Sequence, residues 1–103
     1  MTKKRLQPDD RKEQILKAAI KVAARPGGWS KLTREAVARE AGCAEGLPSK
    51  YFGTMVNFKR AIMRAAIHDW NLSVIAQGLA AGDRVALKAE DDLKRKALAT
   101  LAG

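Results

Sequence analysis

The sequence is poor in cysteine, in aromatic residues and in long apolar runs. Its single cysteine, Cys43, excludes an intramolecular disulfide, and a reducing cytoplasm is the default compartment for such a chain. Aromatic residues make up only 5% of the chain, which disfavours a β-sandwich, because strands are enriched in aromatic and β-branched side chains. No uninterrupted apolar run approaches the ~18 residues that a membrane span requires, so we expect no membrane partner.

Residue sets that carry out catalysis or bind metals are also missing. His68 is the only histidine, and no cysteine or second histidine stands at ligand spacing from it. There is no glycine-rich phosphate loop, no supported Ser/His/Asp set and no carboxylate pair beside a plausible pocket. We therefore expect neither an enzyme nor a bound metal or cofactor, and we interpret Cys43 as a buried small apolar residue.

Positive charge is abundant and unevenly distributed. The chain carries 20 Lys and Arg against 11 Asp and Glu, a net charge of +9. Residues 1–60 hold 14 basic and 6 acidic side chains, whereas residues 61–80 sum to zero and residues 81–103 hold 5 basic and 4 acidic ones. A cationic first half suits a nucleic-acid-binding protein, because contacts to phosphates release condensed counterions. Binding to an anionic membrane, or general solubility, would account for the same charge.

Apolar residues at helical spacing predict an all-α protein. The pattern predicts a first helix over residues 9–24, ended by Pro26-Gly27-Gly28. A second short helix begins after Thr33 as its N-cap and ends at Gly42. A third short helix lies between residues 44 and 52 and starts late, near Gly46–Pro48, because proline fits only the first helical turn.

The second half predicts two further helices. Phe58, Ile62, Ala65, Ala66, Trp70 and Val74 form an apolar stripe that indicates one long helix over residues 54–77. Val85, Ala89, Leu93, Ala97 and Leu101 recur at every fourth position and indicate a fifth, C-terminal helix. We divide the chain into a basic flexible arm (1–8), a three-helix helix-turn-helix unit (9–53) and C-terminal helices that form a dimerisation region (54–103), with Trp70 and Val74 as dimer contacts.

Several residues in this order resemble a known family. The segment from Thr33 to Gly42, followed by Gly46 and by Tyr51-Phe52, is similar to the N-terminal DNA-binding domain of the tetracycline-repressor (TetR) family. The resemblance also takes in Ile15 to Ala19 and Phe58, and it covers about residues 9–67. It implies a homeodomain-like helix-turn-helix that binds palindromic operators as a homodimer.

The sequence departs from that family in two respects. Only about 36 residues follow the matched region, too few to enclose a small molecule between helices, so we expect no inducer pocket and no small-molecule ligand. In the recognition segment, Ala44 replaces the usual polar cap, Ser49 replaces an aromatic residue, and Pro48 lies inside the segment. The resemblance therefore leaves open which residues contact bases.

We predict DNA contacts from the second and third helices and from the arm. The predicted contact residues are Lys31, Thr33, Arg34, Gly46, Ser49, Lys50 and Tyr51, with Lys3, Lys4 and Arg5 reaching an adjacent minor groove. Lys50 would contact guanine or phosphate, and Tyr51 stands where the family's tyrosine touches a phosphate. The alternatives are a solvated Lys50, a Tyr51 that packs in the core, and an arm that only aids solubility.

These features predict a regulator of transcription in the bacterial cytoplasm, associated with the nucleoid. We expect a repressor that binds double-stranded DNA as a homodimer, of the kind that a plasmid or phage uses to control its own operon. Two alternatives stay open: an architectural protein that binds DNA without sequence preference, and a protein-interaction adaptor built on a helix-turn-helix scaffold. The sequence does not distinguish repression from activation.

Overall fold

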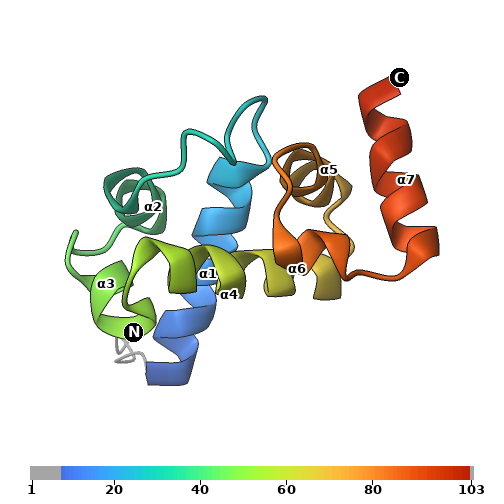
Figure 1. Ribbon diagram of the computed structural model, residues 1–103. Coiled ribbons are helices and arrows are strands. Elements are labelled where there is room, and N and C mark those ends of the chain that lie inside the picture. Colours follow the sequence, from blue (N-terminus) through green and yellow to red (C-terminus); the bar gives the residue numbers. More distant parts are fainter. Residues whose placement is uncertain (1–7, 103) are drawn as a thin grey trace, which may run out of the picture.

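The structure, a computed structural model, describes residues 8–102, and this part of the chain is all-helical (Figure 1). Its helices, in chain order, are α1 (Pro8–Ala23), α2 (Arg34–Ala41), α3 (Leu47–Phe52), α4 (Met55–His68), α5 (Leu72–Ala80), α6 (Arg84–Leu87) and α7 (Asp91–Ala102). The predicted all-α class is confirmed. Within the described range, no helix is long and apolar enough to cross a membrane.

Helices α1 and α4 cross near the middle of the molecule and divide it into two ends. Figure 1 shows α2 and α3 at one end of α4, and α5, α6 and α7 at the other. Helix α1 packs on α2 and α4, and α7 packs chiefly on α5. Most side chains of the core between them are small or medium in size, the aromatic Trp29 being also buried there, and the largest that are fully buried are Phe58, Ile15, Ile62, Met63 and Ile75.

Helix α1 follows the predicted pattern closely. Asp9 and Asp10 lie in its first turn, where carboxylates interact favourably with the positive end of the helix dipole. After the helix, the chain turns sharply at Gly28. A Cβ atom there would lie within 3.0 Å of three backbone oxygens, those of residues 22, 23 and 25. Because these backbone atoms cannot move away at low energetic cost, only glycine fits this turn.

The predicted long helix over residues 54–77 is wrong. Helix α4 ends at His68, Trp70 adopts a left-handed φ of 55°, and Asn71 caps α5 by accepting a hydrogen bond from the Val74 N–H at 3.1 Å. The apolar stripe continues across this break, because both helices face the same core. The asparagine cap and the tertiary packing outweigh the periodicity.

The predicted C-terminal helix is also interrupted. A single turn, α6, ends at Leu87, and α7 begins at Asp91 with two aspartates in its first turn. Gly78 allows α5, α4 and α6 to approach one another, since a Cβ atom there would lie 3.2 Å from Cβ of Ala86 and still closer to the end of the Met63 side chain. Of the predicted repeat, Leu93 and Ala97 are buried, and Leu101 is exposed.

Candidate nucleic-acid interface

The segment from Thr33 to Gly53 holds most of the residues predicted to contact DNA. Thr33 caps α2, its Oγ1 accepting a hydrogen bond from the Ala36 N–H at 3.1 Å. Gly42 ends the helix with a left-handed φ of 70°, as glycine at this position commonly does. The predicted cap and stop of the second helix are therefore both confirmed.

Helix α3 begins late, as the proline predicts. Gly46 occupies its N-cap position, and Pro48 lies in its first turn, where a missing N–H costs nothing. Gly53, with a φ of 74°, ends the helix by donating its N–H to the Ser49 carbonyl at 2.8 Å. This gives a six-residue helix with well-defined ends.

One side of α3 is anchored in the protein. Pro48 is buried, and Leu47, Tyr51 and Phe52 are half-buried against the core. The ring of Phe52 stacks on that of Phe58 of α4, with ring centroids 5.1 Å apart and planes at 22°. These contacts fix the orientation of α3 relative to α4.

The other side of α3 faces outward. Ser49 and Lys50 are exposed, and Gly46 ahead of them is exposed with open space where a side chain would stand. Lys50 Nζ lies 5.8 Å from the centroid of the Tyr51 ring, so these two side chains share one edge of the helix. We name this outward surface, formed by Gly46, Ser49, Lys50 and the rim of Tyr51, the α3 face.

Two alternatives were predicted for Tyr51, a contact with a phosphate and packing in the protein core. Its side chain is half-buried and packs against the core, which is the alternative to a phosphate contact. Being only half-buried, it also keeps surface at the edge of the helix next to Lys50. The packing contact is therefore observed, and the phosphate contact stays a prediction.

The predicted contacts ahead of and within α2 lie near its first turn. Lys31 and Thr33 are exposed, and Arg34 is half-buried. Arg34 Nε is buried and has no hydrogen-bond partner among the described residues, which is uncommon for a guanidinium nitrogen. Neither Lys31, Arg34 nor Lys50 lies within 4.0 Å of a carboxylate in residues 8–102.

Two other cations are already paired, and they hold α1 against α2. Glu40 of α2 forms ion pairs with Lys21 (3.3 Å) and Arg25 (2.6 Å). Hydrogen bonding from Lys21, together with its charge and with the Arg25 contact, lowers the pKa of Glu40 and outweighs the opposite effect of burial. Lys21 and Arg25 therefore have a structural partner that Lys31 and Lys50 lack within residues 8–102.

The remaining predicted site residues fall in different places. Lys3, Lys4 and Arg5 lie outside the described residues. Trp70 is 51% exposed, with Lys96 Nζ 4.8 Å from its ring centroid, so its ring stays accessible for a partner. Val74 is fully buried in the core of its own chain, which leaves no surface of this side chain for the predicted dimer contact.

The two reactive side chains singled out by sequence have ordinary surroundings. His68 is exposed, with its Nδ1 3.2 Å from Asp69 Oδ1, and no group of metal-binding side chains occurs within residues 8–102. Cys43 is half-buried against the core rather than fully buried.

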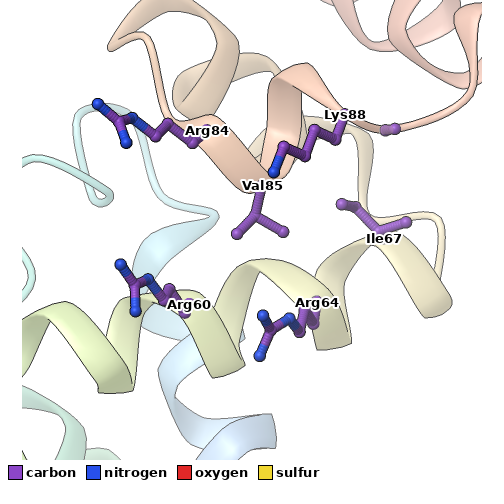
Figure 2. A pocket seen from close by; sticks show the side chains of 7 residues that line it. Arg60, Arg64, Ile67, Arg84, Val85 and Lys88 are labelled. Carbon is purple, nitrogen blue, oxygen red and sulfur yellow. The ribbon is translucent and has the colours of Figure 1, made fainter.

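A basic cleft between α4 and α6 is a feature that the sequence analysis missed. It is an open cleft of about 500 Å³ whose walls carry Arg60, Arg64, Arg84 and Lys88 (Figure 2). The available signal was the spacing: Arg60 and Arg64 are four residues apart, as are Arg84 and Lys88, so each pair shares one helix face. That the two faces oppose each other follows only from the packing of α6 on α4.

Comparison with known proteins finds no match for this chain: no family model, no curated protein and no solved structure is significantly similar to it. The relation to the TetR family therefore stays a prediction, and it depends on the residues between Ile15 and Phe58 alone.

Proposed function

We propose that the protein is a sequence-specific DNA-binding regulator of transcription, and within that class a repressor that binds a palindromic operator as a homodimer. In this proposal α1, α2 and α3 act as a helix-turn-helix of the homeodomain-like or TetR-like type. The observation that carries the proposal is the α3 face: Gly46, Ser49 and Lys50 point outward while Pro48 and Phe52 anchor the same helix.

The size of α3 is compatible with the major groove. Six residues at a rise of about 1.5 Å each give a helix roughly 9 Å long. The major groove of B-DNA is about 12 Å wide and admits an α-helix whose side chains reach the base edges. The small residues Gly46 and Ser49 would allow the backbone of α3 to come close to the DNA.

Electrostatics support contact with phosphates around this helix. Lys31, Arg34 and Lys50 have no carboxylate partner among residues 8–102, so their charge is available to DNA. The net charge of +9 favours association with any polyanion and gives a strong dependence on salt. Sequence preference would come from Ser49 and Lys50, and Tyr51, Thr33 and Arg34 would fix the position on the backbone.

The small DNA-contacting surface of one subunit supports a homodimer. A single six-residue helix reads few base pairs, and two copies related by a two-fold axis would read half-sites about one helical turn, roughly 34 Å, apart. We expect the contact between copies to lie in residues 54–103, where Trp70, Leu98 and Leu101 are exposed.

The test is selection of bound sequences from a random pool of duplex DNA, followed by affinity measurements on the enriched sequence. We expect enrichment of an inverted repeat. Lys50→Ala should weaken binding by about tenfold or more, in line with the loss of one base or phosphate contact of 1–3 kcal/mol. Arg95→Ala is the matched control, because Arg95 is an exposed cation on α7, away from α3.

The outcome separates the three functional classes. Tight, salt-dependent binding with no enriched sequence would replace the regulator with an architectural DNA-binding protein. Weak binding that is indifferent to salt would favour a protein-interaction adaptor. Equal losses in Lys50→Ala and Arg95→Ala would contradict the assignment of the α3 face even if DNA is bound.

A further inference from the structure

The basic cleft between α4 and α6 is distinct from the α3 face. Figure 2 shows Arg60 and Arg64 on α4, with their side chains running along that helix, Lys88 extending from the end of α6, and Val85 pointing toward α4 between the two helices. Arg84 extends at the outer edge of the same cleft. The cleft therefore has a cationic rim on both sides.

The four cations of this rim have no acidic partner among the residues that the structure describes. Arg60, Arg64, Arg84 and Lys88 are all exposed, and none has a carboxylate within 4.0 Å in the part of the chain that the structure describes. The acid nearest in sequence, Asp83, lines the adjoining groove and is engaged as the cap of α6, accepting the Ala86 N–H at 2.9 Å. The local field is thus strongly positive.

This clustering opposes folding rather than supporting it. Like charges four residues apart on a helix repel each other, and here two such pairs line one cleft. Apolar residues fill the region where α4 and α6 meet: Met63 of α4 and Ala86 of α6 are fully buried, and both lie close to Gly78 of α5. The cations therefore add nothing to the core, and a bound anion would relieve their repulsion.

The walls of the cleft also indicate what kind of anion fits. Its inner surface contains the half-buried apolar side chains of Ile67, Val85 and Ala89, and its volume of about 500 Å³ falls within the range of small-molecule sites. Arginine guanidinium groups match phosphate oxygens in pairs of parallel hydrogen bonds, and lysine adds a point charge. A ligand with linked phosphates and an apolar or aromatic body would use both the rim and the inner surface.

We propose that the cleft between α4 and α6 binds an organic polyphosphate of about the size of a nucleoside triphosphate. This proposal differs from the expectation, drawn from chain length, that the protein takes no small-molecule ligand. Duplex DNA is a less suitable ligand for the cleft. Its outer surface is convex, so it would contact the cations at the rim without reaching the apolar side chains inside. The site is independent of the α3 face and of the proposed regulatory function.

The test uses the full-length protein with ATP as the probe and inorganic tripolyphosphate and adenosine as partial probes. Isothermal titration calorimetry should give saturable 1:1 binding of ATP, weaker binding of tripolyphosphate and none of adenosine. The double variant R64Q/K88Q should lower ATP affinity by about tenfold or more, since two charge-assisted contacts are lost. The control K12Q/R95Q removes two exposed cations from α1 and α7 and therefore has the same net charge.

Several results would overturn the proposal. Equal loss of ATP binding in both double variants would indicate a general charge effect, and absence of saturable ATP binding would exclude the site. If R64Q/K88Q leaves ATP binding unchanged but weakens binding of a random duplex, the cleft contacts DNA instead. Lys50→Ala, which tests the regulatory function, should leave ATP affinity unchanged, so the two proposals fail separately. Circular dichroism of each variant checks that its helices are retained.

Discussion

Phe52 and Phe58 stack across the junction of α3 and α4, with ring centroids 5.1 Å apart. Phe58 is fully buried, and Phe52, the last residue of α3, is half-buried on top of it. Only Gly53 and Thr54 separate the two helices in sequence, so this pair fixes the angle at which α3 leaves α4. The orientation of the α3 face therefore depends on a contact made on the opposite side of the same helix.

Replacing Phe52 with alanine should loosen α3 without unfolding the rest of the protein. We expect a loss of about 1–2 kcal/mol in the free energy of unfolding, less than for a fully buried phenylalanine, from lost stacking and lost apolar area. DNA affinity should fall by a larger factor than the loss of folded protein alone would cause. Urea denaturation and fluorescence anisotropy measure the two effects, and Phe52→Leu, which keeps most of the apolar contact, should lie between. DNA binding unchanged in Phe52→Ala would contradict this coupling.

Gln77 of α5 uses both the oxygen and the nitrogen of its side-chain amide to hydrogen-bond to the backbone at and after the end of α1. Its Oε1 accepts the Trp29 N–H at 2.9 Å, and its Nε2 donates to the carbonyls of Ala23 (2.7 Å) and Arg25 (3.1 Å). Gln77→Ala should lower the free energy of unfolding by about 1–3 kcal/mol, since partly buried backbone groups lose their partner. Gln14→Ala is the control, because Gln14 makes one bond to backbone, to the Ala41 carbonyl at 3.2 Å, and otherwise accepts only from the Arg11 side chain at 2.8 Å among residues 8–102. Equal effects of the two substitutions in denaturant titrations would argue against the role of Gln77.

The Glu40 cluster should make stability depend on pH in the acid range. Because its pKa is lowered in the folded protein, Glu40 binds a proton more weakly there than in the unfolded chain. Its contribution is therefore present above pH 4.5, the ordinary value for this group, and is lost as the pH falls through the lower folded value. Melting temperatures of the native protein and of Glu40→Gln should differ at pH 7 and converge at low pH. A constant difference between the two proteins would contradict this prediction.

The exposed apolar residues of the second half should mediate self-association. Trp70 is 51% exposed at the turn between α4 and α5, and Leu98 of α7 is 48% exposed. We expect sedimentation equilibrium to give about twice the 11.2 kDa chain mass, and Trp70→Ser with Leu98→Ser to shift the protein toward monomer. Val56→Ser, which alters an equally exposed apolar residue on α4, should not. A monomeric native protein at micromolar concentration would exclude this dimer.

Local signals predicted the first half of the fold well. Thr33 and Gly42 act through short-range hydrogen bonds and backbone conformation, and each stands at the predicted end of the second helix. The late start of α3 was likewise predictable, because the effect of Pro48 is confined to its own turn. These residues also fix which side chains of α3 face outward.

Tertiary packing decides the rest, and the sequence pattern does not reveal it. The stripe from Phe58 to Val74 has helical spacing on both sides of Trp70, so periodicity gives no sign of the left-handed turn there. Val74 was predicted as a dimer contact, and the structure buries it fully in the core of its own chain instead. The basic cleft requires α6 to fold back on α4, which no local signal encodes.

The most direct test of the proposed function is to map which face of the protein lies against the DNA. A single cysteine would be placed just ahead of α3 by Glu45→Cys, or on α7 by Arg95→Cys, each combined with Cys43→Ala, and labelled with an iron–EDTA reagent that cleaves nearby DNA. With the selected operator duplex, the α3 label should cut at discrete positions within each half-site, and the α7 label should cut weakly or not at all. Equal, diffuse cutting from both positions, or cutting from α7 alone, would contradict insertion of α3 into the major groove.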